Sequence, residues 1–274
     1  MTDGARHMLL QRTGYAVTQM TSTGLKHDGK NPAGAPSTLY SHNVRIDERL
    51  FDLWANARGF TCRNGSHVPG PLYHHALAEL LGDRAPQCFG TVRHRNFGIS
   101  IAFYSPFDLD ALRRPNRGRG TADIENSMKF NRVFCIPAPT FKPGERIAFL
   151  VRLRPDAGLG AHPAVYRATR EDGALIARGD EGAVTLAYHR ELGSMLADCG
   201  VLIASELVEF EYALFCDDGI ACEQPSKWLP TIQLRCEFDV TDPARFYELM
   251  LSGIGGSRDH GYGMLRISVE WRRP

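Results

Sequence analysis

The sequence predicts an α+β protein assembled from β-α-β-β-α-β units. Three observations support this prediction. Strand-like and helix-like segments follow that order through the second half of the chain, and the first half can be interpreted in the same way. A glycine-rich loop, residues 253–263, separates the last helix from the last strand. Arginines gather in residues 108–132, which predicts a helical insertion in the first half.

Composition and cysteine usage limit the class of protein. The chain has 274 residues, of which 43% are hydrophobic and 23% charged, as in globular proteins with room for two small domains. Its seven cysteines are odd in number and form no C-x-x-C pair, which argues against a disulfide framework and a structural zinc site. No apolar run is long enough to span a bilayer. We therefore expect a cytoplasmic protein without metal, cofactor or membrane contact.

Charge is unevenly distributed, although the formal net charge is only +1. Residues 198–248 contain eleven acidic and three basic side chains, so the rest of the chain carries a net charge of +9. Such an asymmetry predicts a basic face.

The first half is predicted to begin with a strand at residues 9–21, where β-type residues roughly alternate. Residues 22–43 are rich in Gly, Pro, Ser and Asn and predict a long loop, a feature that is often functional in compact domains. Asp47 is the predicted N-cap of a helix that ends at Gly59, and a second helix spans 71–81. Strands are predicted at 88–95, 97–105 and near 133–137.

The arginine-rich segment is predicted to form a short helical excursion that contacts phosphates. Its bases lie among Pro and Gly residues, and a guanidinium fork matches a phosphate bidentately. These basic residues are Arg113, Arg114, Arg117, Arg119, Lys129 and Arg132. A solvated surface segment without a ligand is the alternative interpretation.

The second half follows a Pro-rich linker at residues 136–145. Alternation predicts strands at 146–153, 201–215 and 231–240, and helical spacing predicts a helix at 182–200. Asp242 and Pro243 supply the N-cap and first-turn proline of a last helix. The glycine-rich loop and a strand at 264–271 complete a ferredoxin-like order.

The glycine-rich loop contains Gly253, Gly255, Gly256 and Arg258. Glycines occur where φ is positive or where another backbone approaches closely, and adjacent glycine amides can form an anion-binding concavity. The spacing is not that of a dinucleotide site, since Arg258 occupies the third glycine position of G-x-G-x-x-G, and no G-x-x-x-x-G-K-[ST] motif is present. The loop therefore predicts a phosphate contact outside the nucleoside-triphosphatase class.

The stretch LSGIGGSRDHGYGMLRI resembles the glycine-rich loop of the RAMP superfamily of CRISPR-associated proteins, in particular the endoribonucleases that process repeat RNA. In that family the loop lies between the last helix and last strand of the C-terminal ferredoxin-like domain. The resemblance implies two tandem ferredoxin-like domains, residues 1–137 and 138–274, that bind a CRISPR repeat hairpin and associate with other effector subunits. The long early loop and the arginine-rich insertion resemble those of the type IV processing nuclease.

The resemblance also implies a metal-independent reaction. The ribose 2′-OH attacks the adjacent phosphate and leaves a 2′,3′-cyclic phosphate and a 5′-OH, which requires a base, an acid and cations. In relatives, residues that follow the first strand contribute, and the matching region here offers His42, Lys30, Arg45 and Tyr40. His42 is the first choice for acid–base work, Lys30 or Arg45 for charge stabilisation, and Tyr40 for orienting the 2′-OH.

Two other functions are open at this point. A non-catalytic RAMP-type subunit would bind guide RNA through the same loop and insertion without cutting it. A small-molecule enzyme on an α+β fold would have no RNA affinity and would contain a closed apolar pocket.

Overall fold

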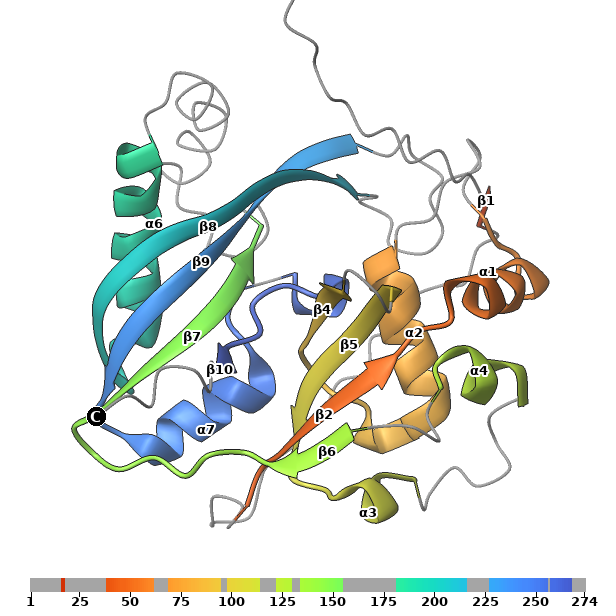
Figure 1. Ribbon diagram of the computed structural model, residues 1–274, viewed down its shortest axis with the longest axis horizontal. Helices are drawn as coiled ribbons and strands as arrows, with labels where there is room; N and C mark the ends of the chain where they lie inside the picture. The colour runs from red at the N-terminus through yellow and green to blue at the C-terminus, as the bar shows by residue number, and fades with distance from the viewer. Residues whose placement is uncertain are drawn as a thin grey trace, which may run out of the picture.

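The computed structural model describes residues 16–17, 38–61, 69–94, 98–113, 122–129, 134–154, 181–215, 227–255 and 257–267. It contains two four-stranded antiparallel sheets and a small two-stranded pair (Figure 1). The α+β prediction is confirmed, and the two large sheets separate between Pro137 and Glu145.

The first domain is a ferredoxin-like unit with strand order β4-β5-β2-β6. Its strands are β2 (Tyr40–Arg45), β4 (Phe89–His94), β5 (Gly98–Ser105) and β6 (Phe134–Pro137). Its helices are α1 (Glu48–Ala57), α2 (Pro69–Leu81), the short η1 (Gly82–Arg84), α3 (Leu109–Arg113) and α4 (Ala122–Ser127). β1 (Ala16–Val17) pairs with β3 (Phe60–Thr61) beside α1.

The second domain repeats this topology with strand order β10-β7-β9-β8. Its strands are β7 (Glu145–Leu153), β8 (Gly200–Phe215), β9 (Lys227–Val240) and β10 (Arg266–Ile267). Its helices are α6 (Glu181–Leu196), α7 (Pro243–Ser252) and the short η4 (Arg258–His260). Within each four-stranded sheet the first strand in chain order, β2 or β7, is central and lies beside the third, β5 or β9, which is the ferredoxin-like arrangement.

Local sequence signals set the helix ends as predicted. The Asp47 side chain accepts a hydrogen bond from the Leu50 amide at 3.2 Å, and α1 stops before Gly59, whose φ is 73°. Asp242 caps α7 in the same way through the amides of Ala244 and Arg245, at 3.0 and 3.1 Å. The aspartates satisfy amide groups that a helix N-terminus otherwise leaves without partners.

The predicted first strand at residues 9–21 is wrong as the first strand of the sheet. The central strand is β2, which lies within the residues that were expected to form the end of a long loop. Of residues 9–21, the structure describes only Ala16 and Val17, which form β1. The segment YSHNVR has few β-forming residues, and its pairing with both β5 and β6 makes it a strand.

The expected arginine-rich excursion is built into the first domain. α3 and α4 occupy the place of the second helix of the ferredoxin-like unit. Leu112, Ile124 and Met128 are fully buried in the core that the helices share with the sheet. Residues 114–121 and 130–133 of this segment lie outside the described part of the chain.

Helix α7 lies between the two sheets (Figure 1). One continuous core contains Ala102 and Tyr104 from β5 together with Phe246 and Met250 from α7. The Tyr104 hydroxyl accepts a hydrogen bond from the Ile267 amide at 3.1 Å. The face of the first sheet that its own helices leave open is therefore partly covered by the second domain. Within the described residues, no helix combines the length and apolarity needed to cross a bilayer.

Candidate nucleic-acid interface

The glycine-rich loop packs against the first domain. Gly253 has a φ of 70°, and a Cβ at this position would overlap the Cys88 side chain. Gly263 has a φ of 79°, and a Cβ there would overlap the carbonyl group of Ile254. Positive φ and close approach therefore require these glycines.

Several amides of the loop are already hydrogen-bonded within the protein. Gly253 N donates to Leu249 O at 2.7 Å, and Gly263 N donates to Arg152 O at 2.9 Å. The Gly253 amide is thus engaged within the protein, and the RNA contact expected at this residue stays a prediction. Gly255, with a φ of 78°, keeps its predicted role as a proposal, and Gly256 lies outside the described residues.

Arg258 closes the end of α7. Its Nη1 donates to the carbonyl oxygen of Ser252 at 3.1 Å, an interaction that suits the carbonyl-rich C-terminus of a helix. Its side chain is half-buried. This bond gives Arg258 a structural role alongside the RNA contact that the sequence predicts.

His42 lies inside the first domain. It has no exposed surface, its Nε2 lies 3.0 Å from the carbonyl oxygen of Phe107, and its ring stacks on Phe103 with centroids 5.0 Å apart. Burial lowers the pKa of His42, while the Phe107 carbonyl and Asp108 partly oppose this shift. A fully buried ring does not touch bound RNA, so this geometry does not support acid–base work by His42.

The other three predicted catalytic residues differ in how they are placed relative to His42. Tyr40 is half-buried on the same strand, and its ring centroid lies 6.5 Å from that of His42. Lys30 lies outside the described residues. Arg45 is exposed at the end of β2, and its odd-numbered spacing from His42 places it on the opposite face of the sheet.

Arg45 belongs to a polar group that the sequence analysis missed. It pairs in register with Ser100 on β5, and the Ser100 hydroxyl is 2.8 Å from Nε2 of His94 on β4. Cross-strand partners share one face of a sheet, so Arg45 and His94 flank Ser100 on the face away from the helices. The sequence did contain a signal for this group. His94 is two residues after Val92 on the same predicted strand, so both side chains lie on the face away from the helices.

The arginine-rich segment is described only in part. Arg114, Arg117, Arg119 and Arg132 lie outside the described residues, and Arg113 is the last residue of α3. Lys129 has a positive φ of 42°, and its Nζ forms a salt bridge with the Asp47 carboxylate at 3.1 Å. Lys129 thus neutralises the N-cap of α1, and its RNA contact stays a prediction.

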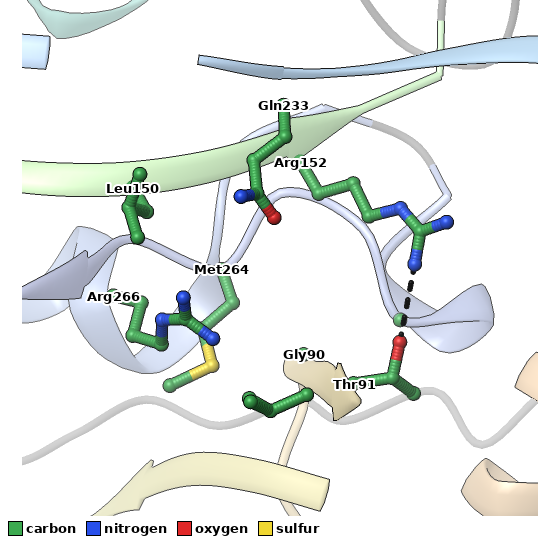
Figure 2. A pocket seen from close by; sticks show the side chains of 9 residues that line it. Gly90, Thr91, Leu150, Arg152, Gln233, Met264 and Arg266 are labelled. Atoms are coloured by element: carbon green, nitrogen blue, oxygen red, sulfur yellow. Dashed lines mark hydrogen bonds between the residues drawn. The ribbon is translucent and has the colours of Figure 1, made fainter. Parts of the chain in front are cut away.

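A cleft lies where β4 meets the second sheet and the glycine-rich loop (Figure 2). It is shallow and partly open to solvent. Its lining includes Gly90 and Thr91 from β4, Arg152 and Gln233 from β7 and β9, and Met264 and Arg266 next to or within β10. None of the nine described residues around it is acidic.

The two arginines of the cleft differ in their partners. Arg152 donates from Nη1 to the Thr91 hydroxyl at 3.3 Å, forms a salt bridge with Glu211, and lies 5.5 Å from the ring centroid of Tyr262. Arg266 is half-buried, and no hydrogen bond or carboxylate partner is found for it among the residues that the structure describes. Burial lowers its pKa, with Tyr104 opposing the shift. Sequence analysis missed both arginines, although they interrupt apolar alternation in their strands.

No cluster of three or more His, Cys, Asp or Glu side chains suited to a metal ion occurs within the described ranges. The acidic residues of β8 are instead near arginines. Glu206 lies 3.1 Å from Arg235 Nη1, and Glu211 pairs with Arg152. Glu206 and Glu211 of β8 are thus paired with arginines and do not form a metal site with each other.

Two solved structures share the fold over most of their length. A CRISPR endoribonuclease Cse3 bound to a 19 nt RNA aligns with a TM-score of 0.51 and 14% identity, over 84% of this chain and 99% of that chain. Cse3 of Thermus thermophilus, bound to an RNA representing a pre-cleavage complex, aligns with a TM-score of 0.50 and 13% identity over the same shares. No protein-family model and no curated protein sequence matches the chain. At these identities the similarity establishes the shared fold.

Proposed function

We propose that the chain binds a CRISPR repeat hairpin and cleaves precursor crRNA at that repeat by metal-independent attack of a ribose 2′-OH. The observation that carries this proposal is the fold. The alignment covers 84% of this chain and 99% of an endoribonuclease solved with bound RNA. The position of the glycine-rich loop, between the last helix and the last strand, supports the same conclusion.

Arg45 and His94 form the proposed reacting surface. Cleavage needs a proton acceptor for the 2′-OH, a proton donor for the leaving 5′-oxygen, and positive charge near the phosphate. His94 supplies an imidazole held by Ser100, and Arg45 supplies a guanidinium on the same face. Lys30 is proposed as a second cation. The proposed role of Tyr40 in orienting the 2′-OH is tested separately, because its even-numbered spacing from His42 places it on the face of β2 opposite to Arg45.

The protein is further proposed to stay on its product and to associate with other effector subunits in the cytoplasm. Phosphate contacts from the arginine-rich segment would hold the hairpin, because an A-form duplex exposes its backbone more readily than its base edges. Replacing Arg113, Arg114, Arg117 and Arg119 together should weaken hairpin affinity and flatten its salt dependence. The type IV assignment stays a prediction.

A non-catalytic guide-RNA-binding subunit is the second candidate function. The burial of His42 favours it, because the histidine that the sequence predicts for acid–base work has no exposed surface. The small-molecule alternative predicts a closed apolar pocket, whereas the cleft next to β4 is partly open and is lined by two arginines.

A cleavage assay separates these functions. The purified protein is mixed in EDTA with the repeat hairpin of its own locus, and with a copy that carries a 2′-deoxy residue 5′ of the cut. We expect the first RNA to be cut and the second to stay intact. Binding without cutting would support the non-catalytic subunit, and neither binding nor cutting would overturn both RNA functions.

Variants then assign the roles. His94→Ala and Arg45→Met should abolish most cutting while hairpin affinity is retained. His189→Ala is the matched control, because His189 also bonds a serine, Ser205, at 3.1 Å but lies on α6. The same panel tests Lys30, Tyr40 and His42, and a specific loss of cutting in His42→Phe would restore the acid–base prediction for that residue.

A further inference from the structure

We infer that the cleft between β4 and the second sheet binds one internucleotide phosphate of a single-stranded RNA segment, with Arg266 as its charged ligand. The inference rests on the proposed function, because RNA is the source of the phosphate. It adds a binding site that is separate from the hairpin contacts and from the reacting surface at Arg45 and His94.

Arg266 is a half-buried cation that lines the cleft. It lies opposite Leu150 in the β10–β7 pair and is half-buried at the cleft. A guanidinium stays protonated in proteins, and burying a charge is costly unless an opposite charge or hydrogen bonds compensate it. Within the described residues no such compensation is found for Arg266. The cleft therefore contains a cation whose ligand comes from outside the described fold.

Arg152 lines the same cleft but supplies hydrogen-bond donors without net charge. Glu211 neutralises its charge, and Thr91 and Tyr262 hold its guanidinium in place. Its buried Nε has no hydrogen-bond partner among the described residues. Figure 2 shows Arg152 and Arg266 on two sides of the space, with Gln233 between them. A ligand between them would meet one net positive charge and several N–H donors.

The lining of the cleft indicates the kind of ligand. A phosphodiester carries one negative charge and accepts hydrogen bonds from a planar guanidinium fork. Val92, Leu150 and Met264 provide apolar walls beside the arginines, which suit a sugar or base attached to that phosphate. One phosphodiester with its attached sugar or base matches this combination of charge and apolar surface.

The test compares three labelled RNAs by fluorescence anisotropy across a salt series. They are the repeat hairpin alone, and the hairpin with a short oligouridine extension at either its 5′ or its 3′ end. The wild-type protein should bind one extended RNA more tightly than the hairpin. Arg266→Met should weaken binding of that RNA about tenfold or more, leave the hairpin alone unchanged, and lower the salt slope by about 0.7.

Arg146→Met is the matched control. Arg146 lies on the same face of β7, is exposed, and forms a bidentate pair with Asp239 outside the cleft. It should leave the affinity for the extended RNA unchanged. An extension that adds no affinity, an unaffected Arg266→Met variant, or an equal loss in Arg146→Met would each overturn the inference.

Two further measurements keep folding and binding apart. Because Arg266→Met removes a half-buried charge without a described partner, the thermal midpoint of the variant should equal or exceed that of the wild type. A large decrease would instead indicate a structural role. In the wild-type protein, single methylphosphonates along the extension should reveal one sensitive position. Uniform small losses would count against a defined phosphate site.

The outcomes also separate this inference from the proposed function. If the hairpin is bound and cut while the extension contributes nothing, only the cleft site fails. If the hairpin is neither bound nor cut and the extended RNAs do not bind, the proposed function and the cleft site fail together.

Discussion

The two sheets share one topology but differ in what covers their second face. In the first sheet, Ile101 and Phe103 face the domain's own helices, and Ala102 and Tyr104 face the second domain. Both faces of β5 are consequently buried over most of its length. The exposed Arg45 lies at the end of β2.

The second sheet has one apolar face and one charged face. Along β9, the core residues Leu234 and Phe238 alternate with Arg235 and Glu237 on the opposite face. This face bears most of the cleft's charged and polar side chains. The same topology therefore has two uses. The second face of the first sheet packs against the other domain, whereas the charged face of the second sheet is left as a surface for ligands.

The largest loss of stability is expected at the contact between the domains, which we call the seam and which includes Gly253 against Cys88 and Ile267 against Tyr104. Gly253→Ala would force a Cβ into the Cys88 side chain in addition to a positive φ of 70°. We expect unfolding free energy to fall by about 3–5 kcal/mol, measured by urea denaturation. Gly144→Ala is the control, because its φ is 81° but no atom lies near the added Cβ, so only about 1–2 kcal/mol should be lost. Equal losses in both variants would show that the seam tolerates the added methyl group.

A smaller effect at the same seam is expected from Tyr104→Phe. This change removes the acceptor of the Ile267 amide, and a part-buried hydrogen bond of this kind contributes about 0.5–1.5 kcal/mol. The same denaturation experiment measures the loss. Tyr40→Phe, at a half-buried tyrosine of the neighbouring strand, should change stability less. If the two variants are indistinguishable, the hydrogen bond across the seam contributes little.

The sequence predicted the second domain better than the first, for a physical reason. In the strand RIAFLVRL, Arg146 and Arg152 lie on the outer face of β7, while Ile147, Phe149, Val151 and Leu153 alternate into the core on the other face. The strand YSHNVR has no such alternation, because Ser41 and Asn43 are half-buried and His42 is fully buried. A polar central strand gives no period-2 signal.

The candidate site was less accessible to sequence reasoning than the fold. The need for loop glycines was predictable from their number, and Gly253 and Gly263 confirm positive φ and close approach. Arg152 and Arg266 are more than 100 positions apart in sequence, and only strand pairing brings them to one cleft with β4. His42 is predicted to be the acid–base group from its residue type alone, and sequence does not reveal that its ring is buried.

The pH dependence of stability should distinguish the two domains. Burial lowers the pKa of His42, His74 and His75, all in the first domain. The unfolded chain therefore binds protons at these sites before the folded chain does. Their contribution is complete above about pH 6.5 and is lost as the pH falls below it. Urea denaturation across this range should show the decrease, and His42→Phe should reduce it; an unchanged slope would exclude His42 as a contributor.

The smallest effect is expected on the charged face of the second sheet. Arg146 and Asp239 form two hydrogen bonds, at 2.7 and 2.9 Å, but both side chains are accessible to water. Solvent screens such a pair and ordering its side chains costs entropy, so Arg146→Met should leave the urea midpoint unchanged within error. A clear decrease would show that this face supports the fold. An unchanged midpoint, together with lower RNA affinity in Arg266→Met, would show that its arginines can serve ligands because the fold does not depend on them.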